Sequence, residues 1–174
     1  MITYRNIEKK DLEKIYDLDM SEHIDEAYVL REGELKIYPN VLDIPNWDEE
    51  KREKIKGKIE KVINENGVVI GAYEEDILVG IVSLSKKVIS GNRVQLVTLH
   101  IDKGRRGMGI GSKLFDLIVK EAKDLNVAGI YISASPKKNT IDFYLHKGCV
   151  STKNIDEELL KEEPEDIHME YVFS

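Results

Sequence analysis

The spacing of apolar residues predicts helices in the first third of the chain. Ile2–Arg5 alternates between apolar and polar positions and is expected to form a short strand. Helical spacing then predicts helices over Lys10–Met20 and Asp48–Asn64, the second ended by the turn signal Asn66-Gly67. Prolines and asparagines interrupt residues 21–47, so a short helix followed by a loop is expected there.

From residue 68 onwards the apolar pattern becomes typical of strands. Val68–Tyr73 and Ile77–Ser85 are joined by three acidic residues, which indicates a hairpin-like connection. Val88–Gly91 is expected to extend the second of these strands. Another apolar run, Val94–Ile101, predicts the next strand, so three strands with antiparallel connections are expected in the middle of the chain.

The last third of the chain alternates between helical and strand-like segments. The expected elements are a helix Ser112–Asn126, a strand Gly129–Ser133, a helix Lys138–Lys147, a strand Cys149–Thr152, an acidic loop and a closing strand Ile167–Phe173. The full order predicts an α/β fold in which a single mixed, mostly antiparallel central sheet is flanked by helices. At this length, one domain over residues 1–174 is expected.

Composition restricts where the protein is expected to work and what it binds. The chain is 41% hydrophobic and 34% charged, with no apolar run near membrane-spanning length, so a soluble protein without a membrane partner is expected. Residues 1–15 lack the pattern of a signal peptide. Cys149 is the single cysteine, which excludes an internal disulfide and fits the cytoplasm. The histidines are scattered, so we expect no structural metal.

Charge is unevenly distributed along the chain. The net charge of −7 argues against nucleic acid as a partner. Residues 102–113 nevertheless carry four basic residues and one acid, whereas residues 154–170 carry eight acids and one lysine. Residues 17–34 carry seven acids and one arginine. One surface therefore suits an anion and two suit a cation, unless the acidic runs are only solvated faces.

The most informative segment is Arg105-Arg106-Gly107-Met108-Gly109-Ile110-Gly111-Ser112, between the predicted strand Val94–Ile101 and the helix after it. Three glycines at alternate positions leave a row of backbone N–H groups unshielded by side chains. The N-terminus of the adjoining helix adds a partial positive charge. This glycine loop is therefore predicted to bind a phosphate or pyrophosphate group.

Two common nucleotide-binding motifs do not fit the glycine loop. A Walker A loop needs Lys and then Ser or Thr after its last glycine, but Gly111 is followed by Ser112-Lys113. A Rossmann fingerprint counted from Gly107 would need a glycine where Ser112 stands. A purely structural glycine loop would leave the two flanking arginines unexplained.

Two segments match motifs that occur together in one enzyme superfamily. Leu99–Gly111 fits a strand followed by Arg/Gln-x-x-Gly-x-Gly/Ala, and Phe143–Cys149 is similar to Phe-Tyr-x-x-x-Gly-Phe. The chain thus resembles the GNAT superfamily of acetyl-CoA-dependent N-acetyltransferases, and the order of elements fits over nearly the full length. The segment Pro164–Tyr171 also looks like the closing strand of bacterial members.

The resemblance implies acetyl-CoA as the donor substrate. In the family, loop amides bind the coenzyme A pyrophosphate, and the preceding strand splays from its neighbour and pairs with the pantetheine arm. Lys103, Arg105 and Lys113 would add charge attraction, partly screened by salt. The coenzyme-binding positions implied are Leu99, His100, Ile101, Arg106, Gly107, Met108, Gly109, Ile110, Gly111 and Ser112.

The resemblance also implies a catalytic residue. Tyr144 corresponds to the family tyrosine that protonates the departing thiolate, although a packing role for its side chain is the alternative. The family's asparagine slot holds Lys137 here. Asn139, two residues later, is expected either to contact the coenzyme or to cap the helix Lys138–Lys147.

One departure leaves the general base open. Many members carry a glutamate where this chain has Gln95, which cannot accept a proton. The base is then another side chain or a water chain held by Gln95, while His100 and Cys149 are interpreted as packed residues. The candidate bases are Glu22, His23, Glu26 and the acids of residues 154–170.

The acceptor cleft of the family lies where both acidic runs are expected. We therefore predict direct attack, in a ternary complex, by a primary amine of a small molecule such as an amino acid, a polyamine or an amine antibiotic. The alternatives are a protein N-terminal or lysine acetyltransferase and a noncatalytic coenzyme A-binding sensor. Edge strands of the sheet permit a homodimer. The candidate acceptor-side residues are Glu26, Tyr28, Tyr38 and Gln95.

Overall fold

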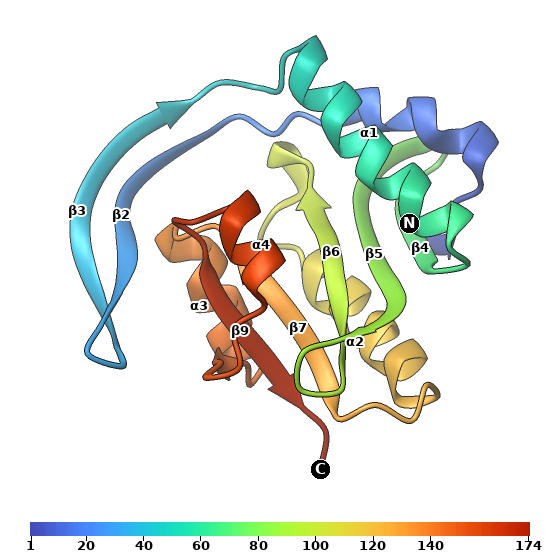
Figure 1. The fold of residues 1–174 in the computed structure, drawn as a ribbon. Coiled ribbons are helices and arrows are strands. Elements are labelled where there is room, and N and C mark those ends of the chain that lie inside the picture. Colours follow the sequence, from blue (N-terminus) through green and yellow to red (C-terminus); the bar gives the residue numbers. More distant parts are fainter.

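One central sheet organises the molecule in the computed structural model, which describes residues 1–174 (Figure 1). Its strands lie in the order β1-β4-β5-β6-β7-β9-β8, and only β6 and β7 run parallel to each other. The expected α/β fold with a mixed, mostly antiparallel sheet is therefore confirmed. The strands are β1 (Ile2–Asn6), β4 (Val68–Glu74), β5 (Ile77–Ile89), β6 (Arg93–Ile101), β7 (Gly129–Ala134), β8 (Val150–Ser151) and β9 (Ile167–Val172).

Helices cover both faces of this sheet. The 3-10 helix η1 (Lys9–Asp17) and α1 (Glu49–Asn64) pack on one face, and α2 (Ile110–Lys123) and α3 (Lys138–His146) pack on the other (Figure 1). Each layer buries its own apolar core, of eleven residues on the η1 and α1 side and 21 residues on the α2 and α3 side. Close packing from both sides therefore fixes the central strands in place.

The helix predicted over Lys10–Met20 is present as η1, but it is a 3-10 helix and ends earlier. Leu12, Ile15 and Leu18 are all buried against the sheet. Their spacing of three residues matches the period of a 3-10 helix, in which positions i and i+3 lie on the same side. The spacing of apolar residues in this segment of the sequence therefore agrees with the 3-10 helix that forms.

The largest difference from the sequence prediction lies in residues 21–47, where no helix forms. They form a two-stranded antiparallel hairpin, β2 (Glu22–Arg31) and β3 (Glu34–Ile44), which curves along one side of the molecule (Figure 1). Its turn consists of Glu32 and Gly33, with φ angles of 52° and 79°. Two-residue turns with positive φ at both positions usually carry Asn-Gly or Asp-Gly, so this turn is a weak sequence signal.

Pro39 also hides the hairpin from sequence analysis. It lies in the middle of β3, opposite Glu26, where the register of the two strands shifts after Ile24. The outer edge of β3 has no partner strand. Proline is tolerated in strands at edges and bulges because no ladder hydrogen bond is lost there. The residue that suggested a loop therefore lies inside a strand.

The acidic segment predicted as a loop contains a short helix, α4 (Glu157–Glu162). Asp156 caps this helix, because its carboxylate accepts hydrogen bonds from the backbone N–H groups of Glu158 and Leu159, each at 3.1 Å. Acidic residues in the first turn favour the positive helix N-terminus. A helix of six residues is too short to show an apolar period. The remaining predicted elements are present close to their expected bounds.

A buried arginine on β6 forms hydrogen bonds to β9 and to the residues after β8. Arg93, at the start of β6, is 2% exposed. Its guanidinium donates hydrogen bonds to Glu170 on β9 at 2.5 Å, to the Thr152 hydroxyl at 2.8 Å and to the Asn154 carbonyl at 2.6 Å. It also lies over the ring of Tyr131 on β7. The buried charge is thus fully paired and ties the strands together at this end of the sheet.

Three further observations concern partners and reactive groups. None of the helices combines the length and the apolar character needed to cross a membrane. No group of three or more His, Cys, Asp or Glu side chains is placed to hold a metal ion. Cys149 is buried in the core, where burial raises the pKa of its thiol to about 12, so it packs as a neutral side chain.

Candidate active site

A cleft of about 710 Å³ opens at the carboxyl ends of β6 and β7. The glycine loop and α3 line one side of it, and α1 and the residues around α4 line the other. It brings together most of the predicted site residues, although Met108 and the expected acceptor residues Glu26, Tyr28 and Tyr38 do not line it. The predicted residues in the cleft are Gln95, Leu99, His100, Ile101, Arg106, Gly107, Gly109, Ile110, Gly111, Ser112, Asn139 and Tyr144.

The cleft exists because β6 and β7 separate along their length. The two strands pair only where Arg93–Leu96 meets Gly129–Ile132, and β6 then continues to Ile101 without β7 as a partner. A register shift at Val97 in the pairing with β5 accompanies the separation. The backbone groups on this edge of β6 therefore have no strand partner and can hydrogen-bond to an extended ligand.

The glycine loop presents backbone groups to the same cleft. Gly107 and Gly109 adopt positive φ angles of 75° and 80°, a conformation that favours glycine. A Cβ atom at either position would meet nothing within 4 Å, so the loop surface is open. Gly109 is the N-cap of α2 and supplies no side-chain cap. The first N–H groups of α2 are therefore available to an anion such as a pyrophosphate.

The two arginines of the loop are paired within the protein. Arg105 donates a hydrogen bond through Nε to Glu74 at 3.0 Å, so its charge is balanced and the attraction expected from its side chain is weakened. Arg106 donates to the backbone oxygen of Ile101 at 3.1 Å and lies 3.5 Å from Glu22. Backbone groups and the α2 N-terminus, rather than the arginine charges, are therefore the main anion-binding features of the loop.

Glu22 links the glycine loop to the start of α3 at the cleft. It lies at the start of β2 with only 7% of its side chain exposed, and it pairs with Lys137 and accepts a hydrogen bond from Asn139 at 3.0 Å. Burial alone would raise the pKa of Glu22, but the bonds from Lys137 and Asn139 outweigh it and lower the pKa. Glu22 is therefore a poor proton acceptor. Lys137, not Asn139, is the N-cap residue of α3.

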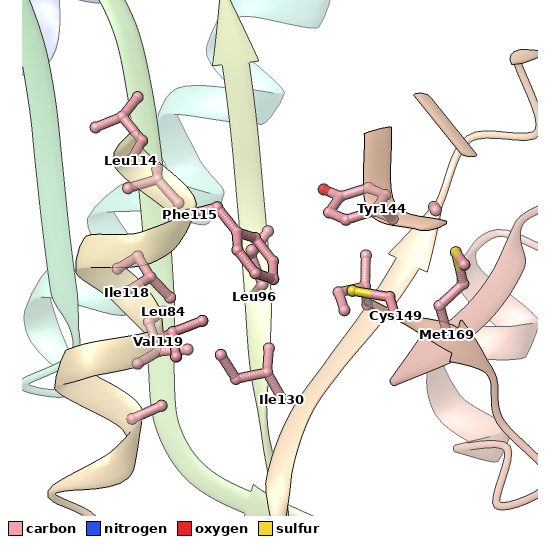
Figure 2. Packing of buried hydrophobic residues seen from close by; sticks show 14 of the residues in the cluster. Leu84, Leu96, Leu114, Phe115, Ile118, Val119, Ile130, Tyr144, Cys149 and Met169 are labelled. Atoms are coloured by element: carbon pink, nitrogen blue, oxygen red, sulfur yellow. The ribbon is translucent and has the colours of Figure 1, made fainter. Parts of the chain in front are cut away.

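Tyr144 lies between the core and the cleft. Its ring packs against Phe115 and Phe143, with ring centroids 6.2 Å and 5.2 Å away, and 6% of the residue remains exposed. Figure 2 shows its hydroxyl oxygen pointing away from Cys149 and Met169, and no protein group bonds to this oxygen. Burial raises the pKa of Tyr144 above its usual range. The residue is therefore a neutral hydrogen-bond donor facing the cleft.

His100 is held as a neutral imidazole. Its ring meets Trp47 edge-on, with centroids 4.7 Å apart. Burial, and then the charges of Lys137 and Lys51, lower the pKa of His100 to about 3. Such a histidine cannot take a proton from an ammonium group near neutral pH, which agrees with its interpretation as a packed residue.

Asp166 has the electrostatic properties that a proton acceptor needs. It lies just before β9 and lines the cleft together with Gln95, Tyr144 and Ser133. Burial raises the pKa of Asp166, an effect that outweighs the hydrogen bond it accepts from the Ser133 hydroxyl at 2.9 Å. Its charge in turn contributes to the raised pKa of Tyr144, which lines the same cleft.

The other predicted acceptor residues lie on the hairpin. Tyr28 donates a hydrogen bond to Asp142 at 2.5 Å and, with Tyr38, lines a second cavity of about 550 Å³, which Asp166 also lines. Glu26 is exposed. His23 bridges two aspartates on the exposed hairpin surface, outside the cleft. The hairpin, which sequence analysis did not predict, places Tyr28 and Tyr38 in a cavity that shares Asp166 with the cleft.

Residues of α1 line the cleft and were missed by sequence reasoning. Lys51, Ile55 and Lys58 share one face of α1, at positions i, i+4 and i+7, and all three line the cleft. The apolar period of α1 already predicted that Ile55 points inward. That period could also have indicated the two flanking lysines, because they lie on the same stripe of the helix.

Comparisons with known proteins agree with this architecture. The sequence profile of the acetyltransferase (GNAT) family matches residues 13–149. An uncharacterized N-acetyltransferase of Schizosaccharomyces pombe is 29% identical over 93 residues. That alignment covers 51% of this chain and 65% of the yeast protein, so the chain spans slightly less than two thirds of that relative.

Solved structures are similar over nearly the whole chain. A Bacillus anthracis protein assigned as a streptothricin acetyltransferase, in complex with acetyl coenzyme A, has a TM-score of 0.69 at 21% identity over 99% of this chain and 100% of that one. A nourseothricin acetyltransferase has a TM-score of 0.74 at 19% identity, covering 98% of both chains. At these identities the likeness establishes the fold. With the profile match over most of the chain, the protein belongs to the GNAT family of acetyltransferases.

Proposed function

We propose that this protein transfers the acetyl group of acetyl-CoA to a primary amine of a small molecule. One observation carries the proposal: the unpaired edge of β6, from Val97 to Ile101, runs directly into an open glycine loop. The strand edge offers hydrogen bonds to an extended amide chain, and the loop offers N–H groups to a pyrophosphate. Coenzyme A has both groups, joined in this order.

The donor substrate is expected to bind through backbone groups. The pyrophosphate would accept hydrogen bonds from the amides between Arg106 and Gly111, with Ser112 at the helix start. The pantetheine arm would pair with β6 near Leu99 and Ile101, which carries the thioester towards the bulge at Val97. A backbone N–H at that point would stabilise the oxyanion that forms when the amine attacks.

Transfer occurs by direct attack. The amine nitrogen forms a bond to the thioester carbonyl carbon, the carbon–sulfur bond breaks, and the amide and free coenzyme A are the products. Because the pKa of Tyr144 is raised above that of a free phenol, near 10, while a thiol has a pKa near 8.5, complete proton transfer to the thiolate is uphill. Tyr144 therefore acts by donating a hydrogen bond to the departing sulfur.

Asp166 is the general base in this proposal. An amine acceptor reaches the site as an ammonium ion and must lose a proton before it attacks. Asp166 is half-buried, lines the cleft near Tyr144, and has a raised pKa, which makes it a stronger base than an exposed aspartate. The proton passes to Asp166 directly or through a water held by Gln95, which itself cannot accept it.

A small acceptor matches the size of the cleft, about 710 Å³. Lys54 on α1 forms an ion pair of 3.9 Å with Glu163 after α4, so these two segments meet beside the cleft. The two similar structures are named as acetyltransferases of streptothricin and nourseothricin, which is consistent with a small-molecule acceptor here.

An amine panel with acetyl-CoA tests the proposal, with release of free thiol as the readout. Turnover of at least one small primary amine, lost or strongly reduced in Tyr144→Phe, is the expected result. Turnover with peptides alone would instead favour a protein acetyltransferase. Binding of acetyl-CoA without any turnover would favour a noncatalytic coenzyme A-binding role.

A further inference from the structure

The five lysines of α1 fall into two groups. Lys54, Lys56 and Lys61 each form an ion pair with a nearby glutamate. Lys51 and Lys58 form none, and they are the two lysines of α1 that line the cleft. Among the lysines of α1, only those on the face that lines the cleft therefore lack an ion-pair partner.

The charges of Lys51 and Lys58 act inside the cleft. Both contribute to the lowered pKa of His100, so their field reaches the end of β6. Lys58 also lowers the pKa of Asp166, although burial of that carboxyl remains the larger effect. An acceptor that bears only positive charges would be repelled by the ammonium groups of these two lysines, which no carboxylate pairs.

We infer that the acceptor carries a carboxylate, or a comparable anionic group, beside its amine, and that Lys51 and Lys58 bind this group. The inference rests on the proposed function. The amine would then face Asp166 and Tyr144 while the anion faces α1. One molecule would thus make favourable charge interactions with both walls of the cleft. The two lysines are seven residues apart, or roughly 10 Å along the helix axis, and their flexible side chains can converge on one anion.

Matched acceptor pairs test this inference. Each pair contains an amino carboxylate and the amine that remains when its carboxylate is removed, such as lysine and 1,5-diaminopentane. Thiol release with acetyl-CoA gives kcat/KM for each member. We expect the carboxylate member of at least one pair to have a kcat/KM at least tenfold above its partner, because only it can bind the two lysines.

Substitutions then assign the preference to α1. Lys51→Gln and Lys58→Gln should each lower kcat/KM for the carboxylate acceptor about fivefold, mainly through KM, and leave the decarboxylated partner unchanged. The expected size corresponds to one partly exposed ion pair of about 1 kcal/mol. Lys61→Gln is the matched control, because Lys61 lies on the same helix but pairs with Glu65 outside the cleft. It should leave both acceptors unchanged.

The outcomes separate this inference from the proposed function. Amines acetylated without any preference for a carboxylate, or Lys51 and Lys58 variants that affect both members of a pair equally, would overturn the inference and leave the proposed function intact. Failure of every amine and every amino carboxylate to release thiol would contradict the proposed function, and the inference would fall with it.

Discussion

The two halves of the cleft are built in different ways. The donor half consists of β6, the glycine loop and α3, which belong to the central sheet and to the helices on one of its faces. The acceptor half is assembled from α1 and the residues around α4, which meet through the ion pair of Lys54 with Glu163. The donor half presents backbone groups and the acceptor half presents charged side chains. Backbone groups suit a donor substrate that many enzymes share, whereas charged side chains suit an acceptor that is specific to one protein.

Loss of the proposed base should have the largest effect and tests whether the acceptor half contributes to the chemistry. Asp166→Asn is expected to lower kcat about a hundredfold, which is within the range for general-base catalysis. The KM for acetyl-CoA should stay within twofold. Steady-state kinetics measure both values. An unchanged kcat would limit the acceptor half to binding.

The same variant has an opposite effect on stability. Burial raises the pKa of Asp166 in the folded state, so the folded protein binds this proton more tightly than the unfolded chain does. The stability from this group is present at low pH and is lost as pH rises through the raised pKa. Asp166→Asn removes the buried charge while an amide oxygen can still accept from Ser133, so Tm at pH 7 should rise slightly.

Tyr144→Phe tests the chemical contribution of the donor half. We expect kcat to fall at least tenfold, because the departing sulfur loses a hydrogen bond, while acetyl-CoA affinity changes little. Phenylalanine keeps the packing against Phe115 and Phe143, so Tm should be nearly unchanged. Kinetics together with a melting curve separate these effects. Unaltered kcat would remove Tyr144 from the mechanism.

Two glycines with the same backbone conformation separate binding from stability. Gly109 in the glycine loop and Gly33 in the hairpin turn have φ angles of 80° and 79°, and a Cβ atom would meet nothing within 4 Å at either position. Alanine at each should destabilise the protein by a similar amount, about 1–2 kcal/mol. Only Gly109→Ala should raise the KM for acetyl-CoA, about tenfold. Equal KM values would show that the loop does not bind the donor.

The smallest effect concerns His100, which lies where the two halves meet. Because its pKa is lowered to about 3, the unfolded chain binds a proton below pH 6.5 that the folded protein excludes. Stability from this group is therefore lost as the pH falls, by about 1 kcal/mol between pH 7 and pH 5.5. His100→Gln should remove this part of the acid dependence. Urea unfolding at the two pH values measures it against the wild type.

Sequence and structure agree best where local chemistry determines the backbone. Gly107 and Gly109 predicted an exposed anion site because glycine at these positions leaves N–H groups open, and both adopt positive φ in an open loop. The apolar runs of the central strands were long enough to define where each strand lies along the chain. The backbone of the donor half was therefore predictable from short segments of the chain, while its binding of coenzyme A stays a prediction.

The acceptor half was predicted poorly because its geometry depends on distant contacts. Glu32-Gly33 is an uncommon turn sequence, and Pro39 lies in a strand only because that strand is an edge. Tyr28 and Tyr38 were expected on the acceptor side, but the hairpin that places them in the second cavity was not predicted. The distinction between Lys51 and Lys54 depends on whether a glutamate from another segment lies nearby, and no local pattern carries that information.

The short junction between β6 and β7 has a mechanical consequence. Four residue pairs join β6 and β7 at the end where Arg93 is buried, and beyond Leu96 and Ile132 each strand pairs only with its outer neighbour, β5 or β9. The width of the gap at the reaction centre therefore depends on how β5 and β9 hold these two strands.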